Sequence, residues 1–256
     1  MNRPFPKMTA HSGCMDLPDN TIASAAMGLK LGADIIEDDI RITRDGILVL
    51  AHDDKIHDSQ GKEDFLISKM NYSELCELDI HTHHGVEGQT IRLAKLESLL
   101  QLMKASGKML NLDLKVDECI QPVSYMVEYY QMLDKVILSG CGAERALKVN
   151  QANPRLQKLL NAEIDLFLTL EYQTAVEITC EHALTAGCFG INIEYRLVRP
   201  ELLAAASMRN LPIWVWTVND VAEMHRLVDM GVYSITSRNI AALAELKRTW
   251  INQAAN

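Results

Sequence analysis

The sequence has no long hydrophobic run, no paired cysteine motif and no excess of basic residues. No stretch reaches the roughly 18 consecutive apolar residues of a membrane-spanning helix, and no apolar run follows the basic N-terminal residues as it would in a secretory signal. The six cysteines are scattered without a C-x-x-C pair, which indicates reduced thiols rather than a disulfide framework. These absences predict a cytoplasmic protein without a transmembrane segment.

Acidic residues outnumber basic ones. The chain of 256 residues carries 25 Lys and Arg against 34 Asp and Glu, a formal net charge of −9. Nucleic-acid binding requires a basic face that releases counterions, so this balance excludes nucleic acid as a partner. A composition that is 48% hydrophobic and 23% charged is ordinary for a folded domain and excludes disorder. If the substrate is an anion, some local feature must reverse the sign of the field.

Strand-like and helix-like segments alternate along almost the whole chain. Strict alternation of eight such units predicts a (β/α)8 TIM barrel, and 256 residues suffice for one barrel domain. An open doubly wound sheet shares the alternation, but no glycine-rich phosphate loop follows an early strand. The eight strands are expected at 8–13, 33–40, 109–115, 136–140, 156–163, 188–195, 212–219 and 232–237.

One segment departs from this alternation. Asp45-Gly46 lies between two strand-like runs and predicts a hairpin after the second strand. The following stretch, residues 54–90, is polar, rich in His and Gly, and without a sustained period. A helix from about 93 to 106 then ends at Gly107. We therefore expect a single domain over residues 1–256 with a small insertion at about 54–90.

Three acidic residues fall near the ends of adjacent strands. Glu37 and Asp39 are two apart and share a face of the second strand, while Asp38 points away and is expected to be solvated. Asp113 lies on the polar face of the 109–115 strand. Carboxylates that converge inside a barrel mouth require a cation, and hard oxygen ligands favour Mg²⁺ or Ca²⁺. Glu37, Asp39 and Asp113 are therefore the expected metal ligands.

Other reactive residues lie near these positions. His11 follows the first strand and His52 ends the hairpin arm, so both are expected beside the carboxylates. Cys14 could be a nucleophile, although a small packing residue is the more ordinary role. The run His81-x-His83-His84 could bind zinc, but nothing supports it against an exposed loop.

Six motifs occur in an order and spacing that resemble the glycerophosphodiester phosphodiesterase family. The family pattern is H-R-G, P-E-N-T, G-A-D with E-x-D, T-x-D-G and H-D, followed by an E-x-K strand and a W-T-V-N strand. The resemblance covers residues 8 to about 240 and implies the same barrel fold. The matching segments here are HSG (11–13), PDNT (18–21), GADIIEDDIRITRDG (32–46), LAHDD (50–54), NLDLK (111–115) and WTVN (216–219).

The resemblance implies hydrolysis of a small-molecule glycerophosphodiester to an alcohol and glycerol 3-phosphate. His11 and His52 would be the general acid–base pair, and Lys115 would contact the phosphate. Glu37, Asp39 and Asp113 would hold one divalent cation, Mg²⁺ or Ca²⁺. Such a cation neutralises phosphodiester charge, and an imidazole pair can carry out both proton transfers near neutral pH.

Two tryptophans and an asparagine lie on the strand at 212–219. Trp214 and Trp216 share a face, where they fill the core or, for Trp216, form a wall against the glycerol carbons. Asn219 is expected to cap the following helix.

The chain departs from the family pattern at Ser12, Asp19, Asp38 and Asp113, and Asp38 introduces a charge where an apolar residue is expected. Ser12 replaces the arginine of H-R-G and so removes a bidentate phosphate clamp. Asp113 replaces a glutamate, and Asp19 replaces the glutamate of P-E-N-T. The loss at Ser12 motivates one alternative, a barrel that binds a phosphorylated ligand without turnover. A second alternative is a lyase-type phosphodiesterase that releases a cyclic phosphate.

Overall fold

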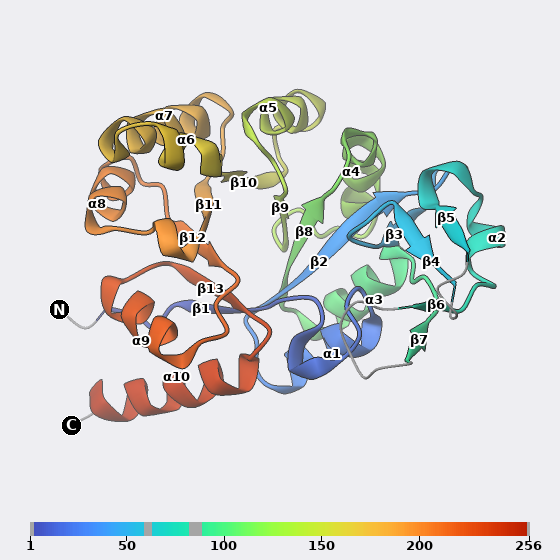
Figure 1. Ribbon diagram of the computed structural model, residues 1–256, viewed down its shortest axis with the longest axis horizontal. Helices are drawn as coiled ribbons and strands as arrows, with labels where there is room; N and C mark the ends of the chain where they lie inside the picture. Colours follow the sequence, from blue (N-terminus) through green and yellow to red (C-terminus); the bar gives the residue numbers. More distant parts are fainter. Residues whose placement is uncertain (1–2, 59–62, 82–88, 255–256) are drawn as a thin grey trace.

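A computed structural model describes residues 3–58, 63–81 and 89–254. Its main sheet contains eight parallel strands and closes on itself, because β1 pairs with both β2 and β13. The predicted (β/α)8 barrel is therefore confirmed, and every barrel strand overlaps a range expected from the sequence (Figure 1). The barrel strands are β1 (Lys7–Ala10), β2 (Ile35–Ile42), β8 (Met109–Leu114), β9 (Val136–Ser139), β10 (Gln157–Asn161), β11 (Gly190–Glu194), β12 (Ile213–Trp216) and β13 (Ser234–Ser237).

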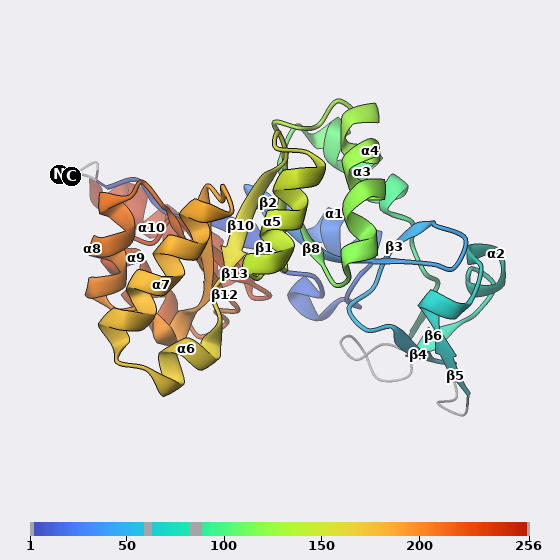
Figure 2. The same cartoon turned by 90° about the horizontal axis from the view of Figure 1, so that it is seen from above.

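Helices follow the barrel strands and cover the outside of the sheet (Figure 2). The first helix begins where the Thr21 side chain accepts a hydrogen bond from the Ser24 N–H, and α3 ends at Gly107 in the left-handed conformation, as expected. Among the described residues, no helix is both long and apolar enough to cross a bilayer. The helices are α1 (Ile22–Lys30), α3 (Leu96–Ser106), α4 (Ile120–Tyr129), α5 (Ala143–Ala152), α6 (Ile164–Thr169), α7 (Tyr172–Thr185), α8 (Pro200–Met208), α9 (Val221–Met230) and α10 (Ile240–Ala254).

The strands alternate between two faces, and this alternation divides the barrel interior into layers. Toward the amino ends of the strands, the interior is filled by a separate buried apolar cluster of Ile35, Ile137, Leu159 and Trp214. Moving two residues along β2 replaces isoleucine with Glu37, and the neighbouring strands make similar changes from apolar to polar side chains. The interior is therefore apolar toward the amino ends of the strands and polar at their carboxyl ends, where the active sites of barrel enzymes lie.

The segment after β2 folds back on the barrel and carries a second small core. Strand β3 pairs antiparallel with β2, as the Asp-Gly turn predicts. The insertion lies at the end of the molecule opposite α8 in both views (Figures 1 and 2). Its apolar cluster includes Ile56, Ile67 and Leu75, which gives this segment packing of its own. Its elements are β3 (Leu48–Leu50), β4 (Lys55–His57), β5 (Asp64–Leu66), α2 (Tyr72–Leu75), β6 (Ile80–His81) and β7 (Thr90–Ile91).

Candidate active site

The three expected metal ligands lie on the inner face of two adjacent strands. In the β2–β8 register, Asp39 is opposite Asp113, and Glu37 is opposite Asn111 one step deeper. Glu37 and Asp39 are only 6% and 5% exposed. The pairing of β2 with β8 therefore brings two aspartates from distant parts of the chain side by side, with Glu37 two residues deeper in the barrel.

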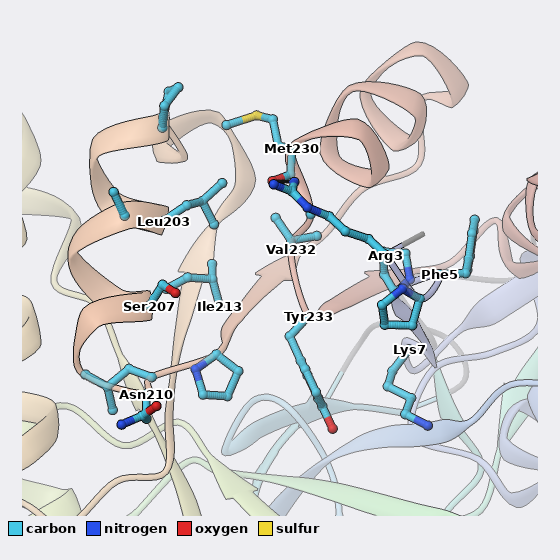
Figure 3. A pocket seen from close by; sticks show the side chains of 17 residues that line it. Arg3, Phe5, Lys7, Leu203, Ser207, Asn210, Ile213, Met230, Val232 and Tyr233 are labelled. Atoms are coloured by element: carbon cyan, nitrogen blue, oxygen red, sulfur yellow. Dashed lines mark hydrogen bonds between the residues drawn. The ribbon is translucent and has the colours of Figure 1, made fainter. Parts of the chain in front are cut away.

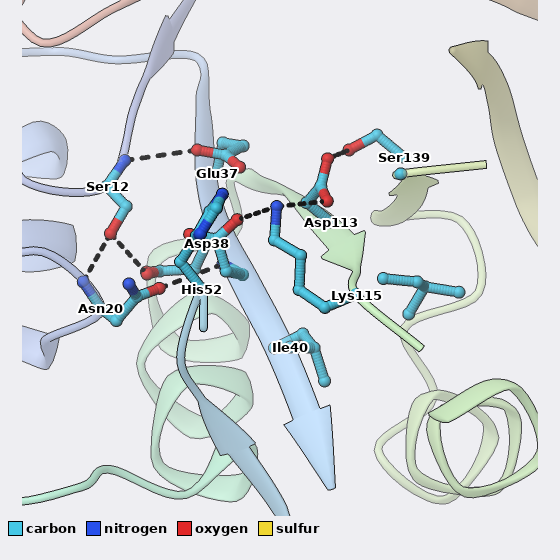
Figure 4. A network of polar contacts seen from close by, with 12 residues as sticks. Ser12, Asn20, Glu37, Asp38, Ile40, His52, Asp113, Lys115 and Ser139 are labelled. Atoms are coloured by element: carbon cyan, nitrogen blue, oxygen red, sulfur yellow. Dashed lines mark hydrogen bonds and ion pairs between the residues drawn. The ribbon is translucent and has the colours of Figure 1, made fainter. Parts of the chain in front are cut away.

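Lys115 lies between the two aspartates. Its Nζ is 2.8 Å from Asp39 Oδ1 and 2.8 Å from Asp113 Oδ1 (Figure 4). Burial alone would lower the pKa of this ammonium, but the two carboxylates more than offset that effect and raise its pKa. The positive charge of Lys115 is therefore engaged with the carboxylate cluster.

Glu37 is buried beside several other acids. Its Oε2 accepts a hydrogen bond from the Ser12 N–H at 3.3 Å and lies 3.8 Å from His11 Nδ1. Burial, followed by the charges of Asp39, Asp113 and Asp38, raises the Glu37 pKa well above its usual value. The site thus holds more negative charge than Lys115 can neutralise.

His11 is held in one orientation by the backbone. Its Nδ1 is 2.8 Å from the Ser12 carbonyl oxygen, which can only accept, so Nδ1 carries the proton and Nε2 has a lone pair. Burial, followed by the charge of Arg238, lowers the His11 pKa to about 4. His11 is therefore neutral at pH 7 and presents a basic nitrogen, as a general base must.

His52 lies apart from this network. Its side chain is 60% exposed, and its Nδ1 is 2.9 Å from Asp53 Oδ1. Arg41 Nε donates to the His52 carbonyl oxygen at 2.8 Å and holds the backbone of this loop. Among the hydrogen bonds and ion pairs of the described residues, none joins His52 to His11 or to the carboxylate cluster.

The prediction for Asp38 is wrong. Its side chain does point away from the barrel interior, but it is fully buried rather than solvated. Ser12 Oγ donates to Asp38 Oδ1 at 2.9 Å and accepts from the Asn20 N–H at 2.5 Å (Figure 4). Within the described part of the chain, Asp38 Oδ2 has no hydrogen-bond partner. Burial, then the charge of Asp39, raises the Asp38 pKa well above its usual value.

The same contacts show where the side chain of residue 12 points. Ser12 is 2% exposed and faces Asp38, so it offers nothing to a ligand at the barrel mouth.

On β12 and the loop after it, the core position of Trp214 is confirmed and the helix cap assigned to Asn219 is corrected. Trp214 fills the apolar layer toward the amino ends of the strands, whereas Trp216 is half-buried at the end of β12, opposite Glu194 in the register. The prediction that Asn219 caps α9 is wrong, because the Asp220 side chain accepts from the Glu223 N–H instead. Asn219 Oδ1 accepts from the Arg238 N–H at 2.9 Å. Position 219 thus braces the loop after β13.

The remaining reactive residues are accounted for as follows. All six cysteines are free, as expected, and Cys14 is buried with a pKa raised by that burial, so it is poorly suited to act as a nucleophile. His81 is exposed on β6. His83 and His84 of the possible zinc motif lie outside the described residues.

Gly140 permits the close packing beside Asp113. It has a φ of +70°, and a Cβ there would lie 2.5 Å from the Leu114 carbonyl oxygen and 2.6 Å from Asp113 Oδ1. We expect Gly140→Ala to lower the free energy of unfolding by at least about 2 kcal/mol, because steric overlap adds to the left-handed strain.

Gly107 provides the matched control for this change. Its φ is +67°, but a Cβ there would meet nothing within 4 Å. Gly107→Ala should therefore cost only about 1 kcal/mol. Urea unfolding followed by circular dichroism compares the two variants, and equal losses would contradict the steric argument.

A larger hollow lies at the other end of the barrel. It has a volume of about 860 Å³ and is lined by Phe5, Leu203, Met230 and Tyr233 together with Arg3 and other residues (Figure 3). It opens at the amino ends of the strands, and none of the described residues that line it is a carboxylate or a histidine. This end of a barrel contributes to stability rather than to catalysis, so the acidic cluster is the better candidate site.

The donor set of the acidic cluster suits a hard divalent cation. Glu37, Asp39 and Asp113 supply carboxylate oxygens, and Asn111 Oδ1 is a buried oxygen without a hydrogen-bond partner in the described structure. One cation, the Lys115 ammonium, already binds two of these carboxylates. As the side chains stand, no group of three acidic, His or Cys residues within the described ranges is close enough to hold a metal.

Sequence reasoning missed one residue at this site. Arg238 directly follows β13, and its Nε donates to the Ser12 carbonyl oxygen at 3.0 Å. The available signal was position alone, since residues after barrel strands line the mouth.

The (β/α)8 fold, with acidic residues and a histidine at the carboxyl ends of its strands, places the chain in the class of barrel enzymes. The glycerophosphoryl diester phosphodiesterase family matches residues 11–242. The chain belongs to this family, and with it to the phosphoric diester hydrolases, so the resemblance found in the sequence is confirmed.

Individual relatives agree with this assignment. A glycerophosphodiester phosphodiesterase of Caldanaerobacter subterraneus is 25% identical over 93% of this chain and 96% of its own length. The crystal structure of a Silicibacter pomeroyi protein that carries the family's name has a TM-score of 0.81 at 22% identity, covering 98% of this chain and 96% of that one. An Oleispira antarctica phosphodiesterase, in complex with its product sn-glycerol-3-phosphate, has a TM-score of 0.76 at 21% identity, covering 97% of each chain.

Proposed function

We propose that this protein hydrolyses glycerophosphodiesters to an alcohol and glycerol 3-phosphate in a reaction that needs one divalent cation. The observation that carries the proposal is the pairing of His11 with the acidic cluster in a chain of this family. His11 has an unprotonated Nε2 and lies 3.8 Å from Glu37, which belongs to the proposed cation site. The site would therefore provide both a general base and a bound cation to neutralise the charge of the phosphodiester.

In this proposal Glu37, Asp39 and Asp113 hold the cation, Mg²⁺ or Ca²⁺. When bound, the cation would neutralise negative charge that develops on the phosphate. Lys115, beside two of these carboxylates, would contact the phosphate oxygens. The half-buried ring of Trp216 would form an apolar wall against the glycerol carbons.

Two proton transfers accompany the bond changes. A water oxygen, or the glycerol 2-hydroxyl in a first step, forms a bond to phosphorus while His11 Nε2 takes its proton. The bond between phosphorus and the leaving oxygen breaks, and His52 donates a proton to that oxygen. In this role His52 carries a proton on both ring nitrogens: Nδ1 donates to Asp53, and Nε2 supplies the proton that the leaving oxygen takes. On the 2-hydroxyl route these steps give a cyclic phosphate, which a water molecule then opens to glycerol 3-phosphate.

Phosphorus NMR of substrate turnover tests the proposal. With glycerophosphocholine or glycerophosphoethanolamine and added Mg²⁺ or Ca²⁺, the diester signal should be replaced by that of glycerol 3-phosphate. A cyclic phosphate that persists would favour the lyase-type alternative. A diester that binds but is recovered intact after long incubation would overturn hydrolysis and leave a ligand-binding barrel.

A further inference from the structure

The charge balance of the proposed site lacks one positive unit. Glu37, Asp39 and Asp113 contribute three negative charges, which a divalent cation and Lys115 together bring to zero. A phosphodiester carries one further negative charge. The side chain of Ser12 is uncharged and buried against Asp38, so residue 12 does not supply the missing positive charge.

Arg238 is a positive charge that the site does not otherwise use. Its guanidinium is half-buried, and its Nε donates to the carbonyl oxygen of Ser12. Among the ion pairs between described residues, none joins Arg238 to a carboxylate, whereas Lys115 has two such partners. An arginine that is half-buried and has no acidic partner is suited to bind an anion.

The geometry places this guanidinium next to the proposed base. The Ser12 carbonyl oxygen accepts from His11 Nδ1 at 2.8 Å and from Arg238 Nε at 3.0 Å, so both side chains lie at one backbone atom. A Cβ built on Gly13 would lie 3.5 Å from the same Nε, so Arg238 reaches the loop that directly follows His11. The backbone of residue 238 is held on both sides, because its N–H donates to Asn219 and its carbonyl oxygen accepts from the Met15 N–H.

We propose that Arg238 binds the substrate phosphate and supplies, from the end of β13, the guanidinium that residue 12 lacks. This inference rests on the proposed function, since it assigns a further substrate-binding residue to the same site. Nε is used by the Ser12 carbonyl, which fixes the plane of the guanidinium and leaves the two terminal nitrogens for phosphate oxygens. Such charge-assisted contacts are about twice as strong as neutral hydrogen bonds.

Substitution of Arg238 separates a phosphate contact from a structural one. Arg238→Gln keeps a donor for Ser12 but removes the charge, whereas Arg238→Lys keeps the charge but loses the fork. We expect the Ki of glycerol 3-phosphate and the KM of the diester to rise about 10- to 100-fold in the Gln variant, and less in the Lys variant. If Arg238 only braced the Ser12 backbone, the Gln and Lys variants would change these constants to the same extent.

Controls make the outcome specific. Arg155→Gln removes one positive charge from an exposed arginine paired with Glu128 and should leave both constants unchanged. Thermal unfolding shows whether each variant is folded, and if Arg238→Gln is not, a threefold or larger rise in Ki for Arg238→Lys carries the test. If the wild type hydrolyses the diester but the Arg238 variants have unchanged Ki and KM values, the inference about Arg238 is overturned while the proposed function stands. If wild type neither turns over the diester nor binds glycerol 3-phosphate, the proposed function fails and the inference with it.

Discussion

Removal of divalent cations is expected to abolish hydrolysis, and addition of Mg²⁺ or Ca²⁺ should restore it. The physical reason is the buried negative charge at the barrel mouth, where burial and then the neighbouring carboxylates raise the pKa of Glu37, and Lys115 neutralises only part of the excess. Turnover of glycerophosphocholine, measured in excess chelator and after titration with each metal, checks this expectation. Full activity in excess chelator would remove the cation from the mechanism.

A variant of one proposed ligand connects this effect to the residues. Asp113→Asn removes one charge from the cluster and should raise the metal concentration needed for half-maximal activity at least about tenfold. Asp134→Asn is the matched control, because Asp134 is exposed and paired only with Lys135 among the ion pairs of the described chain. Equal metal dependence in the two variants would contradict the assignment of Asp113.

His11→Gln is expected to lower kcat by about 10²- to 10⁴-fold, the usual contribution of a general base. Glutamine can still donate to the Ser12 carbonyl oxygen, so the variant should remain folded while losing the basic nitrogen. Steady-state kinetics of the folded variant measure the effect. His225→Gln on the exposed side of α9 is the control and should retain full activity.

The protonation state of His11 can be measured independently of turnover. Because burial and Arg238 lower its pKa to about 4, the imidazole should remain neutral as the pH falls through 6.5 and should gain its proton only near pH 4. A proton–nitrogen NMR titration of the metal-free protein follows this directly. Near-wild-type turnover of His11→Gln would exclude the role of general base given to it here, whereas titration of His11 near pH 6.5 would contradict only the depressed pKa.

The alternation of strand-like and helix-like segments, and of side chains within each strand, was enough to predict the barrel and the inward-facing acids. Strand residues two apart share a face whatever the tertiary arrangement, so Ile35, Glu37 and Asp39 had to line one side together. Eight strand–helix units leave a closed parallel sheet as the simplest way to bury every strand. The convergence of Asp39 with Asp113 followed from these two rules, and the β2–β8 register confirms it.

Local rules failed where a side chain depends on a distant segment. Asp38 was expected in solvent because its strand face points outward, but its carboxylate is buried and accepts a hydrogen bond from Ser12 in the loop after β1. Asn219 lies one residue before the true helix cap, and its amide oxygen is taken by the N–H of Arg238. Neither outcome can be read from neighbouring residues, because each depends on which element packs against the strand.

The negative charge of the whole chain shows the same division. Composition correctly indicated an acidic chain, and strand periodicity assigned three of those acids to one pocket. The sequence also placed Lys115 beside these acids, but the position of Arg238 was decided by barrel closure, because Arg238 and Ser12 are 226 residues apart and meet only when β13 pairs with β1. A contact between the two ends of a chain is set by the closed sheet and not by any local pattern, which is why the fold could be predicted from the sequence and this part of the site could not.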